Sequence, residues 1–181
     1  MISLNVVRYI FDIRVERIYG GYSPNTIPPK EKQIMRRVDY MIGARDFATL
    51  KAEHFMQDVV SYYQVEDTAD KLAGAITEGG FGSVPILARD GTVLGIVSEF
   101  DLLKAIMEGK ELTKVKAGDI MTKGAISVSK ETPAMEIITL LQSKHLIRVA
   151  VVDAEGKLAG IVARRDVLLG YLRATKPIWT F

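Results

Sequence analysis

The chain has 181 residues, of which 48% are hydrophobic and 25% charged, a mixture typical of a globular protein with one domain or two small ones. Its 24 basic and 22 acidic residues leave a formal charge of +2, too small to indicate nucleic-acid binding, and the lack of cysteine excludes disulfides, cysteine-ligated metals and cysteine nucleophiles. No apolar run approaches the ~18 residues of a membrane span and no signal-peptide pattern opens the chain, so we expect a cytoplasmic protein without membrane contact.

Residues 1–50 form an N-terminal extension that precedes a repeated region. The apolar residues of the first eighteen positions fit a helix and also a strand, and both alternatives stay open. GGYSPNTIPP at 20–29 predicts a turn-rich linker, and residues 30–42 predict a helix with one apolar face. That face would pack on the rest of the chain or form an oligomer contact. An enzyme or nucleic-acid binder built on this extension is disfavoured by the weak charge and the absence of an acid–base cluster.

The rest of the chain carries one unit twice, with a constant offset of 65 residues. GTVLGIVSEFDLL at 91–103 recurs as GKLAGIVARRDVL at 156–168. Further upstream, AEHFM at 52–56 recurs as AGDIM at 117–121. A shared offset over separate landmarks indicates one supersecondary unit used twice.

Each copy predicts the order β-α-β-β-α. In the first repeat, residues 51–110, we expect strands at 61–65, 83–87 and 93–97, a helix at 69–77 and a helix from Asp101. In the second repeat, residues 111–172, we expect strands at 125–128, 148–152 and 158–162, a helix at 134–143 and a helix from Asp166. Residues 173–181 form an aromatic tail. Because a unit of roughly 60 residues buries little core alone, we predict an α+β fold with the two repeats packed sheet to sheet and related by pseudo-two-fold symmetry.

This duplicated pattern resembles the tandem cystathionine β-synthase (CBS) domain pair, also called a Bateman module. The resemblance covers about residues 50–172. It rests on the opening segments HFMQD and DIMTK, the strand SVPIL, and the junctions GIVSEFD and GIVARRD. It implies a regulatory module, not itself an enzyme, that binds an adenosine-containing ligand in the cleft between its repeats. It also implies dimerisation, commonly as a flat disc of four repeats.

The junction from Ser98 to Asp101 has two compatible interpretations. Ser-x-x-Asp before two leucines predicts a helix capping box. The same helix start also offers free N–H groups to a phosphate, and Asp101 can accept hydrogen bonds from a ribose. The resemblance assigns the ribose to Asp101 and the phosphate region to Ser98, and it completes site A from the second repeat with Thr122, Ile126, Ser127, Ile147, Arg148 and Val149. Arg148 is the candidate phosphate partner, although a surface charge is an equal alternative.

The second junction departs from the first. Ala163 replaces the serine, while Arg164 and Arg165 add two positive charges that either contact a phosphate or are simply solvated. Asp166 is kept, so we expect a second and weaker site B. The resemblance builds site B from Asp166 together with Ser61, Tyr62, Tyr63, Ser83 and Val84.

The predicted function is therefore a sensor of AMP, ADP or ATP, with S-adenosylmethionine and NADH as further candidates. We expect no required cofactor and no metal site, since His54 and His145 lack metal-ligand spacing. We also expect a homodimer or higher oligomer that regulates an unidentified effector protein. The alternative is a purely structural oligomerisation protein with vestigial pockets, which Ala163 and Glu99 favour, since Glu99 adds negative charge beside site A.

Overall fold

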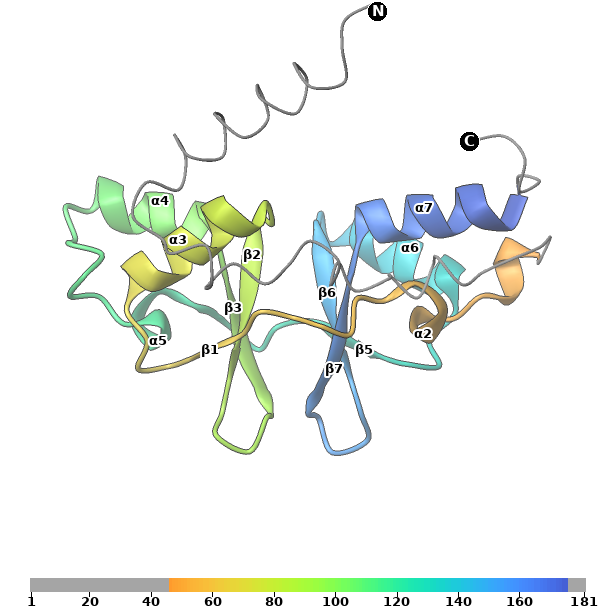
Figure 1. The fold of residues 1–181 in the computed structure, drawn as a ribbon, viewed down its shortest axis with the longest axis horizontal. Helices are drawn as coiled ribbons and strands as arrows, with labels where there is room; N and C mark the ends of the chain where they lie inside the picture. Colours follow the sequence, from red (N-terminus) through yellow and green to blue (C-terminus); the bar gives the residue numbers. More distant parts are fainter. Residues whose placement is uncertain (1–45, 176–181) are drawn as a thin grey trace, which may run out of the picture. The chain divides into compact units, whose positions relative to one another are not determined.

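The structure is a computed structural model that describes residues 46–175 (Figure 1). The predictions for the first eighteen residues, the linker at 20–29, the helix at 30–42 and residues 176–181 of the tail lie outside the described residues. Residues 173–175, predicted as the start of the tail, instead end the last helix. Within the described residues, the predicted α+β fold of two β-α-β-β-α repeats is confirmed. Strands of both repeats lie at the centre and helices lie outside them (Figure 1).

The first repeat contains β1 to β3, α3 and α4. Their bounds are β1 (Tyr63–Gln64), α3 (Ala69–Gly79), β2 (Ser83–Leu87), β3 (Val93–Ser98) and α4 (Glu99–Met107). β2 lies between β1, which is parallel to it, and β3, which is antiparallel, and every side chain of β2 is buried. The strand predicted at 61–65 shortens to β1, since only Tyr63 and Gln64 pair with β2.

The second repeat contains β5 to β7, α6 and α7. Their bounds are β5 (Ser127–Ser129), α6 (Ala134–Ser143), β6 (Arg148–Val152), β7 (Leu158–Ala163) and α7 (Arg164–Thr175). The predicted bounds of α6 and β6 are confirmed, whereas β5 starts two residues later than predicted. Both α4 and α7 begin two residues before Asp101 and Asp166, so each aspartate lies in the first turn of its helix.

Short segments open each repeat, and each segment packs on the other repeat. The first consists of the 3-10 helix η3 (Phe47–Thr49) and α2 (Ala52–Phe55), and the second of α5 (Ala117–Ile120) and β4 (Thr122–Lys123). Ala52 N of α2 donates a hydrogen bond to Thr132 O of the second repeat at 2.9 Å. In the same way, Ala117 N of α5 donates to Asp67 O of the first repeat at 2.7 Å. We did not predict this exchange.

The same exchange completes both sheets. The first sheet has the order β1-β2-β3-β4, in which β4 from the second opening segment pairs antiparallel with β3. In the second sheet, of order β5-β6-β7, Gln57 exchanges two 2.8 Å backbone hydrogen bonds with Ile161 of β7. The close approach needs glycine, since a Cβ atom on Gly95 or Gly160 would lie 2.6 Å from the carbonyl oxygen of Thr122 or Gln57.

Two hydrophobic cores follow from this arrangement. The core of the second repeat includes residues that precede the first repeat's strands, namely Phe47, Leu50, Ala52, Phe55 and Met56. The core of the first repeat includes Ala117, with Ile120 and Met121 packed against it. Neither repeat therefore has a complete core without the opening segment of the other.

Reciprocal hydrogen bonds between the two hairpins show the pseudo-two-fold symmetry. Val93 N donates to Gly156 O at 3.2 Å, and Leu158 N donates to Gly91 O at 3.0 Å. Each residue in one bond lies 65 positions from its counterpart in the other, which is the offset of the sequence repeat. Within residues 46–175, no helix combines the length and the apolar character that crossing a membrane requires.

Candidate functional site between the repeats

The junction between β3 and α4 forms the predicted capping box. Ser98 is the N-cap residue, and its hydroxyl lies 3.4 Å from Asp101 N. In return, the Asp101 carboxylate accepts from Ser98 N at 2.8 Å and from the Ser98 hydroxyl at 2.6 Å. Thr122 of β4 reaches the other carboxylate oxygen at 3.5 Å. The cap uses one oxygen of Asp101 and leaves the other facing the opening segment of the second repeat.

A cavity of about 250 Å³ adjoins this junction. Six of the eight residues predicted for site A line it, namely Ser98, Asp101, Thr122, Ile126, Ile147 and Arg148. Ser127 and Val149 do not. Side chains alternate along a strand, so Val149, which follows Arg148, points into the core of the second repeat, where it is buried. Ser127 is exposed at the start of β5.

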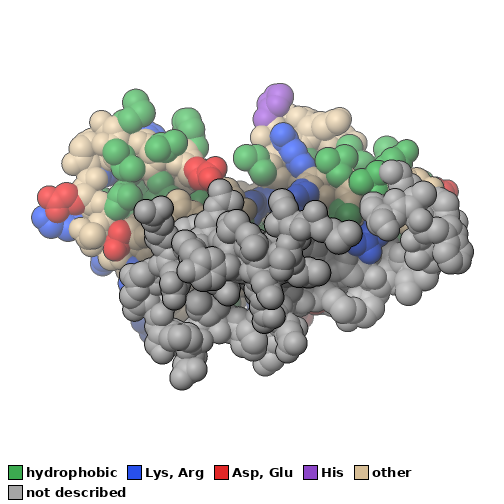
Figure 2. All heavy atoms as spheres, turned by 45° about the horizontal axis from the view of Figure 1, so that its top comes forward, with side chains coloured by type: hydrophobic (Ala, Val, Ile, Leu, Met, Phe, Trp, Pro, Cys, Tyr) green, Lys and Arg blue, Asp and Glu red, His purple; other side chains and the backbone are tan. Residues whose placement is uncertain are grey.

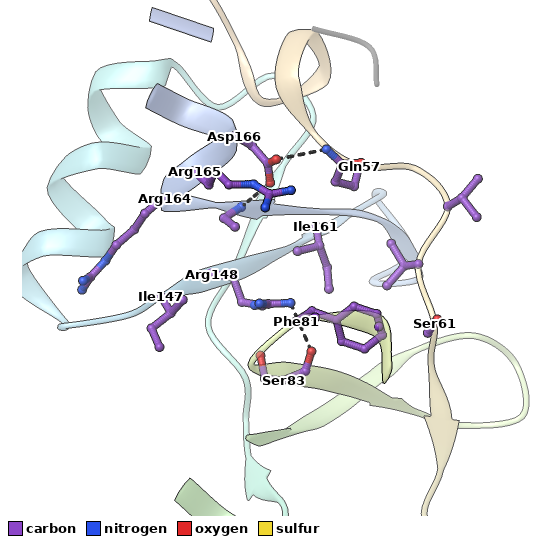
Figure 3. Close-up of a pocket in the computed structure, with 15 residues that line it drawn as sticks. Gln57, Ser61, Phe81, Ser83, Ile147, Arg148, Ile161, Arg164, Arg165 and Asp166 are labelled. Carbon is purple, nitrogen blue, oxygen red and sulfur yellow. Dashed lines mark hydrogen bonds between the residues drawn. The ribbon is translucent and has the colours of Figure 1, made fainter. Parts of the chain in front are cut away.

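The second junction, between β7 and α7, positions Asp166 differently. Asp166 is 4% exposed, and its carboxylate accepts from Ala163 N at 2.9 Å and from the Gln57 side-chain amide at 3.0 Å (Figure 3). Gln57 precedes Thr122 by 65 positions and occupies the same place in the opposite cavity. We missed Gln57 in the sequence, although the repeat offset from Thr122 would have located it.

A larger cavity, of about 480 Å³, lies in front of Asp166. Among the residues predicted for site B, Asp166, Ser61 and Ser83 line it, whereas Tyr62, Tyr63 and Val84 do not. Val84 is fully buried in the first core, and Tyr63 packs against that core. Tyr62 lines a separate hollow near the hairpins. Apolar side chains that we did not predict, including Val59, Val60 and Phe81, also line the Asp166 cavity.

Three arginines surround the Asp166 cavity, but their side chains have different roles (Figure 3). Arg164 points away along α6 and donates from Nε to Leu146 O at 2.6 Å. Arg165 is exposed at the cavity wall. Arg148 reaches across to the first repeat and donates from Nη1 to Ser83 O at 3.2 Å. Positive charge therefore gathers on one side of this cavity.

Arg148 is a half-buried cation that lines the site. Burial lowers the pKa of its guanidinium, and the carboxylates of Asp166 and Glu99 oppose this shift. Its Nε is buried and has no hydrogen-bond partner. A buried cation with an unpaired donor costs free energy unless an anion or acceptor approaches it. The cavities thus contain a group suited to binding an anion.

The described residues show no arrangement typical of a metal centre. Nowhere in residues 46–175 do three His, Asp or Glu side chains converge as candidate metal ligands. The carboxylates in the two cavities are instead held by backbone and side-chain donors at helix starts. Carboxylates and arginines in half-apolar cavities are polar groups of the kind that orient a bound small molecule.

Comparisons with known proteins agree with this geometry. A model of the CBS domain family matches residues 45–108 and again residues 117–172, so the chain belongs to the CBS domain family. The uncharacterized protein MK0525 of Methanopyrus kandleri is 36% identical over 113 residues, which are 62% of this chain and 57% of that protein. The uncharacterized protein YlbB of Bacillus subtilis is 30% identical over 120 residues, 66% of this chain and 80% of that protein.

Solved structures show the same fold. The crystal structure of CBSX2 in complex with AMP superposes with a TM-score of 0.62 at 25% identity, covering 70% of this chain and 98% of that chain. CBSX2 is a CBS-pair protein from Arabidopsis thaliana, and a further structure of it gives a TM-score of 0.62 at 24% identity, over 68% of this chain and 94% of that chain. The chain is thus a tandem CBS pair by sequence and by fold.

Proposed function

We propose that this protein is a regulatory module, not an enzyme, which binds an adenosine-containing nucleotide between its repeats. The observation that carries this proposal is the cavity of about 480 Å³ around Asp166, to which both repeats contribute. Its volume falls within the range of cavities that bind small molecules. The likeness to CBSX2, which was crystallised with AMP, supports the class of ligand.

The residues of the Asp166 cavity suit the three parts of a nucleotide. The buried Asp166 carboxylate would accept hydrogen bonds from the ribose hydroxyls, since each of its oxygens has accepting capacity beyond its present partner. Arg148 and Arg165 would bind the phosphate. Val60 and Phe81 offer apolar surface to the base.

We propose that the Asp166 cavity is the stronger site, which reverses the ranking predicted from the sequence. The Asp101 cavity is about half as large and has the Ser98 hydroxyl already bonded to Asp101. The Glu99 side chain lies near Gly82 on the edge of that cavity, where its charge would repel a phosphate. Arg165 has the opposite effect at the Asp166 cavity.

Regulation would follow from contact with both repeats. A ligand between two repeats changes their arrangement only if it binds one arrangement more tightly than another. Because each opening segment completes the other repeat's sheet, a change in one cavity would be transmitted directly to both cores. An effector protein or a change in self-assembly would receive this signal.

Thermal unfolding with a panel of ligands tests the proposal. AMP, ADP, ATP, S-adenosylmethionine and NADH are the candidates, and GMP is the matched control with the same ribose and phosphate. A cognate ligand at 100 times its Kd should stabilise the protein by about 2.7 kcal/mol and raise the Tm by roughly 5–10 °C. If no adenosine-containing ligand raises the Tm, the protein is not such a sensor, and the structural alternative with vestigial pockets takes its place.

We also propose a homodimer formed through the exposed apolar side chains of α4 and α7, which we call the apolar stripe. Figure 2 shows apolar side chains in separate groups on the two repeats. The stripe consists of Phe100, Leu103, Ile106 and Met107 on α4 and Leu168, Tyr171 and Leu172 on α7. Phe100 is 75% exposed and Met107 is 88% exposed. Apolar surface of this extent is typical of an interface, and the resemblance to dimeric CBS pairs favours a second copy as its partner.

Sedimentation velocity tests the dimer. We expect a species of twice the chain mass that Leu103→Glu converts to monomer, because a charge would be buried at the centre of the α4 part of the stripe. Met135→Glu is the matched control, since Met135 is also exposed but lies on α6 outside the stripe. A monomer at all concentrations, or a dimer that Leu103→Glu leaves intact, would refute this assembly.

A further inference from the structure

We infer that Arg148 is shared by the two cavities and couples them negatively, so that an anionic ligand in one weakens the binding of an anionic ligand in the other. This inference rests on the proposed function and concerns how the two sites regulate each other. It begins with the position of Arg148, which lines both the Asp166 cavity and the Asp101 cavity.

The two repeats differ at this position. Arg148 is the first residue of β6 and pairs with Ala163, and its counterpart in the first repeat is Ser83, which pairs with Ser98. The pseudo-two-fold symmetry thus generates two cavities, but at this pair of equivalent positions only the second repeat supplies a guanidinium. Arg148 spans the symmetry axis, because its Nη1 donates to the carbonyl oxygen of Ser83, its own counterpart.

The guanidinium has donors to spare. An arginine carries five N–H donors, and the structure gives Arg148 a single acceptor, Ser83 O. Its Nε is buried without a partner. Glu99 and Asp166 attract it from the two helix starts, but neither comes within ion-pair distance. Arg148 is therefore a partly buried cation that lies between two carboxylates and forms an ion pair with neither.

An anion in either cavity would attract this guanidinium and form hydrogen bonds with it. Bidentate contact with a phosphate fixes the orientation of the arginine fork, so a phosphate in the second cavity would find the same donors occupied. The first phosphate would also repel the second across a region of low dielectric. Coupling free energies between sites typically change affinity by about 5–150-fold, and we expect a value near 10-fold here.

The order of binding follows from the neighbouring charges. At the Asp166 cavity, Arg165 adds a second cation, whereas Glu99 lies beside the Asp101 cavity. The first nucleotide should therefore bind at the Asp166 cavity, where its phosphate would form hydrogen bonds with Arg148. The Asp101 cavity should then bind the second nucleotide weakly.

Isothermal titration calorimetry with AMP and with adenosine measures how far the phosphate separates the two binding steps in the unmodified protein. Arg165 and Glu99 also contribute to this separation, and the Arg148 variant described next isolates the share that Arg148 contributes. AMP should bind in two steps, the second about 10-fold weaker than the first. Adenosine carries the same base and ribose but no phosphate, so it should bind more weakly and with a clearly smaller difference between its two steps. Two AMP molecules binding with equal affinity, or an equal gap for AMP and adenosine, would overturn the inference.

The variant Arg148→Gln provides the second arm, and Arg164→Gln is its matched control. Both changes remove one positive charge near α7, but the Arg164 side chain is turned toward Leu146 O, away from the shared position. We expect Arg148→Gln to weaken the binding of the first AMP about 10-fold and to reduce the ratio between the two Kd values. Arg164→Gln should leave that ratio unchanged. If one AMP binds per chain in every variant, or if the gap survives Arg148→Gln, Arg148 does not couple the cavities. If neither AMP nor adenosine produces heat and no ligand of the panel raises the Tm, the proposed function itself fails.

Discussion

Replacing Phe55 by alanine should lower the free energy of unfolding by about 3–5 kcal/mol, the usual cost of removing a buried phenylalanine from a core. Phe55 is fully buried, although it lies on a four-residue helix ahead of the first repeat's strands. Its side chain packs against Gly170 of α7, where an added Cβ would meet Phe55 at 3.5 Å. The measurement is urea unfolding. Met135→Ala is the control, because this exposed side chain on α6 should change stability by less than about 0.5 kcal/mol.

Hydrogen exchange on the Phe55→Ala protein would show which repeat is affected. We expect faster exchange in α6 and α7 of the second repeat, whose core Phe55 completes, and little change in α3. A loss of stability below about 1 kcal/mol, or faster exchange confined to the first repeat, would mean that the opening segments are not exchanged between the repeats.

The second large effect is expected for Asp166→Asn, which should weaken the binding of the first AMP by about 100-fold. Hydrogen bonds from the ribose hydroxyls to a charged acceptor contribute more than those to a neutral amide, and two such bonds account for a loss of this size. Asparagine keeps one oxygen that can accept from Ala163 N, and the Gln57 amide can turn so that its oxygen accepts from the new side-chain NH2, so the protein should stay folded. Titration calorimetry gives the affinity.

Asp101→Asn makes the same chemical change in the opposite cavity and is the matched control. We expect it to weaken the first AMP less than about 5-fold, because the first AMP occupies the Asp166 cavity. If Asp101→Asn proves the more damaging change, the ranking predicted from the sequence is right and the one based on cavity size and charge is wrong.

Much of the fold could be predicted because the chain repeats itself. The offset of 65 residues located every main helix and strand of the described region and the two aspartates at the helix starts. The exchange of opening segments could not be predicted in the same way. β4 is two exposed, polar residues with no alternating pattern, and it is a strand only because β3 of the other repeat lies beside it.

The composition of the site was harder to predict than its position. The family pattern identified Asp166, Arg148 and Ser83, but it did not show that Val149 and Val84 point into the two cores. Successive side chains of a strand point to opposite faces, so the burial of Val149 and Val84 follows once the side chains of Arg148 and Ser83 are known to face the cavities. The reach of Arg148 across the symmetry axis depends on three-dimensional contacts between the repeats, which the order of residues does not specify.

A crystal structure of the protein grown with AMP, at a concentration well above its Kd, would test nucleotide binding between the repeats most directly. We expect the nucleotide in the cavity in front of Asp166, with its ribose hydroxyls about 3 Å from that carboxylate and its phosphate beside Arg148 and Arg165. A structure with the same fold in which both cavities hold only water, or in which AMP binds elsewhere on the surface, would contradict the proposed function.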